Sequence, residues 1–188
     1  LISPSKGVTA GHCLHQGNNS VNGYNTQARF YPSYYKSGSN TSTPYGYADA
    51  NWFLVSNNWY KDGSKNSTLG KGWDVGVFVL AKARNASNQA TNLLLGNVVG
   101  WNSFCYSNCL QSYMSLSQYG YPGNYYSGNR MTESQHLASI GSRWQSSTSG
   151  DYVAGSGMEG GSSGGPSILN PGEISDSAVK KGDLTTRN

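Results

Sequence analysis

The chain has 188 residues, a length that suits one domain of ordinary size or an all-β unit with two lobes. Only 12% of the residues are charged, whereas 25 are glycine and 14 are tyrosine, which argues against a helical bundle or coiled coil rich in Ala, Leu, Glu and Lys. The net charge of +4 comes from basic residues spread along the chain, with only Lys180 and Lys181 adjacent, so we expect no nucleic-acid partner.

Short β-prone runs alternate with clusters of Gly, Asn, Ser and Pro, a pattern that predicts an all-β fold. The predicted strands, in chain order, are residues 1–2, 28–31, 52–55, 75–80, 97–101, 115–119, 134–140, 150–154 and 167–169. The polar tract 33–44 is predicted to form a long surface loop, and 81–90 a connection between two halves. We therefore expect two lobes, 1–90 and 91–188, within one domain.

The longest apolar stretches are far shorter than the roughly 20 residues of a membrane-spanning helix, so no membrane partner is expected. Among three cysteines, Cys105 and Cys109 could close a tight local disulfide loop, which leaves Cys13 as a free thiol or paired outside this sequence.

The chain begins with Leu1 rather than Met, as a processed or clipped product would. Four N-x-S/T sequons hint weakly at a secreted protein, which we expect to be monomeric. The histidines and cysteines have no metal-ligand spacing, so no metal or other cofactor is predicted.

Three short segments could carry chemistry. His12 follows the apolar run 8–10, although a lone histidine in that position is more often structural, and His15 and His136 have no comparable context. Ser163 lies in the run 160–166, which could be a plain linker or a turn whose backbone N–H groups bind a developing anion. Asp74 precedes an apolar strand, where it could cap a turn or orient an imidazole.

The order His12, Asp74, Ser163 matches one chain order of the Ser–His–Asp triad. Residues 9–13 (Thr-Ala-Gly-His-Cys), 74–77 (Asp-Val-Gly-Val) and 161–166 (Gly-Ser-Ser-Gly-Gly-Pro) together resemble the motifs T-A-A-H-C, D-I-A-L and G-D-S-G-G-P of trypsin/chymotrypsin-like serine endopeptidases. Residues 120–123 (Gly-Tyr-Pro-Gly) are similar to a turn of the bacterial glutamyl-endopeptidase-like (V8-like) branch.

This resemblance implies two six-stranded antiparallel Greek-key barrels and hydrolysis of protein or peptide substrates by the triad. It also implies an oxyanion hole formed by the N–H groups of Gly161 and Ser163. Gly157 and Met158 stand where the family places the substrate pocket, and the absence of Asp there argues against a trypsin-like preference for Arg or Lys.

Two departures from the family pattern affect these expectations. Ser162 replaces the Asp that in animal trypsins pairs with the newly cleaved N-terminus, so activation by that ion pair is not expected. Compared with the family, few residues precede His12 or follow Ser163. The chain therefore looks truncated at both ends, which would place the usual partner of Cys13 upstream of Leu1.

Two alternatives remain open from the sequence. One is an inactive homologue of such a protease that keeps the fold for binding. The other is a secreted β-rich adhesion or glycan-binding module, for which the many Tyr, Trp and Asn residues could form a platform, although packing explains the aromatic residues more simply.

Overall fold

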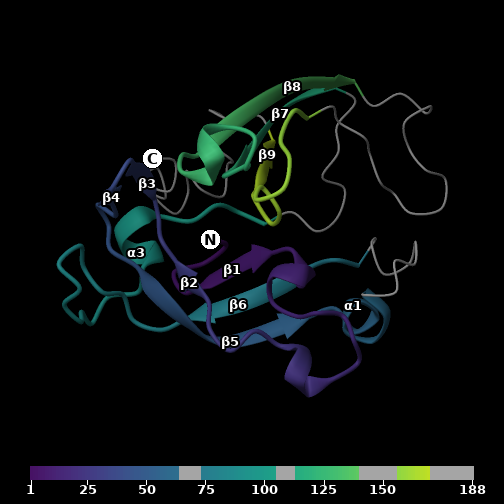
Figure 1. The fold of residues 1–188 in the computed structure, drawn as a ribbon, viewed down its shortest axis with the longest axis horizontal. Coiled ribbons are helices and arrows are strands. Elements are labelled where there is room, and N and C mark those ends of the chain that lie inside the picture. Colours follow the sequence, from purple (N-terminus) through teal and green to yellow (C-terminus); the bar gives the residue numbers. More distant parts are fainter. Residues whose placement is uncertain (64–72, 105–112, 140–155, 170–188) are drawn as a thin grey trace.

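The computed structural model describes residues 1–63, 73–104, 113–139 and 156–169, and strands dominate these parts of the chain (Figure 1). The strands are β1 (Lys6–Thr9), β2 (Arg29–Phe30), β3 (Tyr35–Ser37), β4 (Asn40–Ser42), β5 (Ala48–Val55), β6 (Gly76–Leu80), β7 (Tyr113–Gly120), β8 (Thr132–Ser139) and β9 (Ser167–Leu169). The helical elements are short: α1 (Asn57–Asp62), α3 (Gly96–Val99), η1 (Gly11–Cys13), η2 (Val21–Gly23) and η4 (Tyr126–Gly128). The predicted all-β class is confirmed.

The first half of the chain forms a four-stranded antiparallel sheet in the order β1-β6-β5-β2. Thr9, at the end of β1, pairs with Gly76, at the start of β6. Because the two strands are antiparallel, the chain that leaves β1 and the chain that enters β6 meet at the same edge of the sheet. His12 and Asp74 lie in these two segments, so the pairing of β1 with β6 brings them together.

Two small apolar clusters support this sheet. Ala48, Leu80, Ala83 and Leu95 form one cluster, and Leu14, Val55 and Trp59 form the other, with Phe78 packed against both. Leu95 is completely buried among residues of the first half. The predicted boundary between two lobes near residue 90 remains a prediction.

The second half forms a three-stranded sheet in the order β8-β7-β9, which Figure 1 shows above the sheet of the first half. The start of β9 pairs with the last part of β7, where Ser167 lies opposite Gln118. The segment that enters β9 therefore lies next to the segment that leaves β7. This places the loop around Ser163 beside residues 119–124.

Three of the predicted elements are wrong. Residues 97–101 were expected to form a strand, but 96–99 form helix α3, because a short apolar run does not distinguish the two by its periodicity. Residues 1–2 form no strand; the first strand is β1, in the segment just before the His12 turn. The expected loop 33–44 contains the β3–β4 hairpin, whose residues are all exposed and so carry no apolar alternation.

Other expectations are not decided by the described parts of the chain. The predicted strand 150–154 and the proposed Cys105–Cys109 disulfide lie outside the described residues. The described strands form sheets of four, two and three strands, so the two complete six-stranded barrels remain a prediction. No helix within these ranges is long and apolar enough to cross a bilayer.

Candidate active site

His12 and Asp74 form a two-point contact at the edge of the first sheet. The backbone N–H of His12 donates to Asp74 Oδ1 at 2.7 Å, and the ring Nδ1 lies 2.6 Å from Oδ2. An ionised carboxylate only accepts hydrogen bonds, so this contact favours the tautomer of a neutral imidazole that carries its proton on Nδ1 and leaves the Nε2 lone pair free. Asp74 orients the imidazole, and because the His12 side chain is 44% exposed, the ring remains accessible to a substrate.

Gly11 stands where the motif T-A-A-H-C has alanine, and the packing around it explains this difference. A Cβ on Gly11 would lie 2.9 Å from the indole ring of Trp59 and 3.0 Å from Asp74 Oδ1. Trp59 is buried and its Nε1 donates to the carbonyl of His15 at 2.8 Å, which fixes the indole. Glycine therefore allows Trp59 to pack directly beneath the turn that carries His12.

The loop that carries Ser163 is built from two positive-φ glycines and close backbone contacts. Gly161 has φ +99° and Gly164 has φ +77°, conformations that L side chains rarely adopt. A Cβ on Gly161 would lie 2.6 Å from the carbonyl oxygen of Tyr121. Gly165 N–H closes the turn by donating to the Ser162 carbonyl at 2.9 Å. Of the two interpretations of residues 160–166, the plain linker is therefore wrong: the run is a folded turn that lies against the end of β7.

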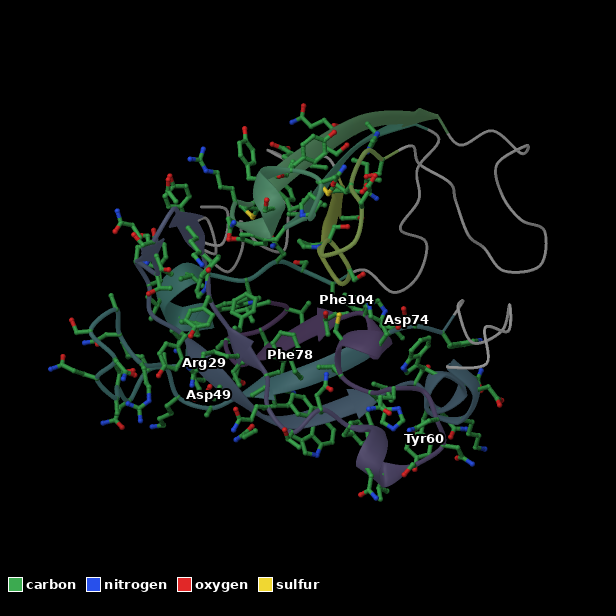
Figure 2. The ribbon with its side chains drawn as sticks, viewed as in Figure 1. Arg29, Asp49, Tyr60, Asp74, Phe78 and Phe104 are labelled. Atoms are coloured by element: carbon green, nitrogen blue, oxygen red, sulfur yellow. The ribbon has the colours of Figure 1, made fainter. Side chains whose placement is uncertain are left out.

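This loop reaches the first half of the chain beside the His12 turn. A Cβ on Gly164 would collide with the Thr9 side chain and would lie 2.7 Å from the Ala10 nitrogen. The Cys13 thiol lies 3.8 Å from the carbonyl oxygen of Ser163. Asp74 lies at the edge of the lower sheet, on the side that faces the loop before β9 (Figure 2).

The structure thus brings His12 and Asp74 into direct contact. It also places the Ser163 backbone beside Cys13, the residue that directly follows His12. Among the described residues, Ser163 Oγ makes no hydrogen bond with His12 or with any other side chain. The side chain of Ser163 is exposed, which leaves the hydroxyl free to rotate. A substrate-free hydroxyl that has not yet bonded to its base is compatible with nucleophilic catalysis, because such bonds often tighten only when substrate binds.

We expect Gly164→Ala to destabilise the chain by about 1–3 kcal/mol, because the new methyl group meets Thr9 in addition to straining a positive-φ residue. Urea unfolding measures this loss. Gly38→Ala is the matched control, since Gly38 has φ +57° but nothing within 4 Å of its Cβ position. Equal losses in the two variants would show that the contact with Thr9 contributes nothing.

The N–H groups of Gly161 and Ser163 donate to no acceptor within the described ranges, so both are available to bind an anion. The hydroxyl of Ser162, by contrast, donates to the Glu159 carbonyl at 2.7 Å. Of the two adjacent serines, only Ser163 has a hydroxyl free of hydrogen bonds to described residues. This difference favours Ser163 over Ser162 as the nucleophile.

The predicted pocket residues Gly157 and Met158 lie in the same loop, upstream of Ser163. Gly157 lies close to Tyr125, whose hydroxyl would be 3.1 Å from an added Cβ. Met158 is half-buried with its sulfur directed toward Gly120. The structure places this pair beside Tyr125 and the end of β7, and their role in substrate binding remains a prediction.

The surroundings of His15 and Cys13 favour a structural role over a catalytic one. His15 is buried, with Nδ1 accepting from Gly17 N–H and Nε2 donating to the Ser20 carbonyl, each at 2.8 Å. Cys13 is a free thiol whose pKa is raised mainly by burial, so it is a poor nucleophile at neutral pH. No group of three His, Cys, Asp or Glu side chains suited to a metal occurs in the described part of the chain.

Sequence reasoning missed two residues that shape this site. Trp59 supports the His12 turn, although no motif distinguishes it from the other aromatic residues in the sequence. Asn124, whose side chain contacts the loop of Ser163, lies in no motif of its own, although it directly follows the run 120–123. That adjacency is the one signal that could have indicated it.

Comparison with known proteins found similarity at the level of structure. The crystal structure of the protease Anisep from Arthrobacter nicotinovorans is 24% identical with a TM-score of 0.64, covering 93% of this chain and 68% of that chain. A thermostable serine protease, AL20, from an extremophilic microorganism is 24% identical with a TM-score of 0.60, covering 90% and 68%. No family model matches the chain, and no curated protein matches it. This chain therefore shares the fold of these two proteases.

Proposed function

We propose that this chain is a serine endopeptidase that cleaves peptide bonds through a Ser163–His12–Asp74 triad and an acyl-enzyme. The observation that carries the proposal is the contact of both Asp74 oxygens with His12, at 2.6 and 2.7 Å, beside a loop in which the exposed Ser163 hydroxyl bonds to no described residue. The fold shared with Anisep and AL20, both named as proteases, supports the same reaction class.

In this mechanism the Ser163 hydroxyl attacks the substrate carbonyl carbon while His12 Nε2 takes its proton. Asp74 holds the imidazole in the tautomer that can accept this proton and stabilises the imidazolium that forms. The N–H groups of Gly161 and Ser163 stabilise the negative oxygen of the tetrahedral intermediate. His12 then returns the proton to the leaving amine, and a water molecule hydrolyses the acyl-enzyme by the same route.

We further propose that the chain belongs to the glutamyl-endopeptidase-like branch and acts outside the cell. Gly120–Gly123, the run that resembles this branch, lies against the Ser163 loop, where Gly123 N–H donates to the Gly160 carbonyl at 2.7 Å. Secretion is supported by the sequons, of which those beginning at Asn18, Asn40 and Asn85 lie on exposed residues.

A fluorophosphonate probe, which phosphonylates activated serines, tests the proposal directly. We expect one label per chain at Ser163 and its loss in His12→Ala, because the imidazole must accept the hydroxyl proton. The control is His136→Ala, since the His136 ring lies in β8, hydrogen-bonded to Ser134, and this variant should keep the label. An unlabelled wild-type chain would favour an inactive homologue or a binding module over a peptidase.

A further inference from the structure

Asn124 connects the turn after β7 with the loop that precedes Ser163. Its Nδ2 donates to the Gly157 carbonyl at 2.8 Å, and its Oδ1 accepts from Glu159 N–H at 3.2 Å. One end of an amide donates and the other accepts, so both ends are used and a flipped amide would fit neither partner. Asn124 is exposed, so these bonds contribute modestly to the free energy of folding and chiefly set the local backbone.

The contact continues from Glu159 to the nucleophile. The carbonyl of Glu159 accepts hydrogen bonds from Ser162 Oγ at 2.7 Å and from Ser162 N–H at 3.3 Å. The Glu159 residue is therefore held by Asn124 at its nitrogen and by Ser162 at its oxygen. Ser162 directly precedes Ser163, so the position of Asn124 is transmitted to the N–H groups proposed to bind the oxyanion.

The turn that carries Asn124 is itself anchored to the first half of the chain. The Tyr121 hydroxyl donates to the Tyr34 carbonyl at 2.9 Å, and the two rings meet edge-on. Arg130 donates to the Tyr35 hydroxyl at 2.9 Å with its guanidinium 4.8 Å from that ring. Tyr34 and Tyr35, at the start of the β3–β4 hairpin, thus support this turn from the first half of the chain.

From these contacts we infer that Asn124 is a positioning residue for the reaction: it holds the backbone of residues 157–161 so that the Gly161 and Ser163 N–H groups point at the oxyanion. The inference rests on the proposed function. It assigns Asn124 no contact with substrate. It requires that the side chain affect the rate of the chemical step more than the stability of the fold.

Asn124→Asp is the sharpest test, because it replaces only the side-chain NH₂ with an oxygen. The acceptor for Glu159 N–H is kept, whereas the donor to the Gly157 carbonyl becomes a carboxylate oxygen that repels it. We expect kcat for a peptide substrate to fall about 10- to 100-fold, the loss typical of a misplaced reacting group. The melting temperature and the pH midpoint of kcat/KM should not change. Fluorophosphonate should still label every chain, but more slowly. Asn124→Ala should behave in the same way.

The control is Asn129→Asp, which introduces the same charge in the same turn. Asn129 accepts from Lys36 N–H through its backbone carbonyl only, so we expect wild-type kcat. The inference is overturned if Asn124→Asp keeps kcat within twofold, or if it lowers the fraction of chains that are labelled rather than the labelling rate. Loss of folding in both Asn124 variants also overturns it, since the role is then structural. A wild-type chain that neither cleaves peptides nor takes the label overturns the proposed function itself, and this inference with it.

Discussion

If Ser163 is the proposed nucleophile, replacing it with alanine should lower kcat for a peptide substrate by a factor on the order of 10⁶, the loss found when the nucleophile of a Ser–His–Asp enzyme is removed. The adjacent Ser162 cannot replace Ser163 as the nucleophile, because its hydroxyl already donates to the Glu159 carbonyl at 2.7 Å. Active-site labelling combined with steady-state hydrolysis measures the effect. The fold should be unaffected, because Ser163 is exposed and its hydroxyl bonds to no described residue.

Ser162→Ala is the matched control for this experiment, since it removes the same hydroxyl one residue earlier in the chain. It loses one hydrogen bond within the loop, worth about 0.5–1.5 kcal/mol, so kcat should fall by no more than about tenfold. A Ser163→Ala variant that retains activity, or a Ser162→Ala variant that loses all of it, would remove the assignment of Ser163 as nucleophile.

The contact between His12 and Asp74 could be expected from the sequence because the candidate residues lie in short contiguous motifs. His12, Asp74 and Ser163 each sit next to a strand end, and antiparallel pairing brings strand ends together: β1 with β6, and β7 with β9. The glycines near Ser163 also carry a local signal, since positive φ at Gly161 and Gly164 follows from residue type.

Other parts of the structure depend on contacts between distant segments and have no local signal. The β3–β4 hairpin has no buried residue, so the period of two that identifies a half-buried strand is missing. Helix α3 and a strand would both fit the short apolar run near Val98, and packing of Leu95 into the first-half core accompanies the helix. Asn124 has its partners about 35 residues later in the chain, which no spacing rule connects.

Two glycines near His12 show how the fold accommodates its candidate site. Gly11 leaves room for the Trp59 indole, and Gly7 leaves room for the Phe78 ring, so each glycine is required by an aromatic side chain rather than by a turn. Both rings belong to the cluster that also includes Leu14 and Val55. The position of His12 therefore depends on the aromatic packing beneath its turn.

Asp74→Asn should lower kcat by a factor of about 10⁴ at neutral pH, because it reverses the tautomer of His12. Two donors face the carboxylate: His12 N–H at 2.7 Å from Oδ1 and the ring Nδ1 at 2.6 Å from Oδ2. An asparagine has one acceptor, and the backbone N–H cannot change its role, so the amide oxygen must face it. The amide NH₂ then faces Nδ1, which must become an acceptor, and the ring proton moves to Nε2. An imidazole protonated at Nε2 cannot take the proton of Ser163.

The control for this variant is Asp49→Asn, which weakens an exposed pair with Arg29, far along the sheet from His12, and should keep kcat near that of the wild type. Hydrolysis rates together with ¹⁵N chemical shifts of the His12 ring separate the causes, since the shifts report which nitrogen carries the proton. A large loss of kcat with the proton still on Nδ1 would contradict the tautomer argument. A loss of less than tenfold would mean that Asp74 does not orient the base, because no other carboxylate within the described residues contacts His12.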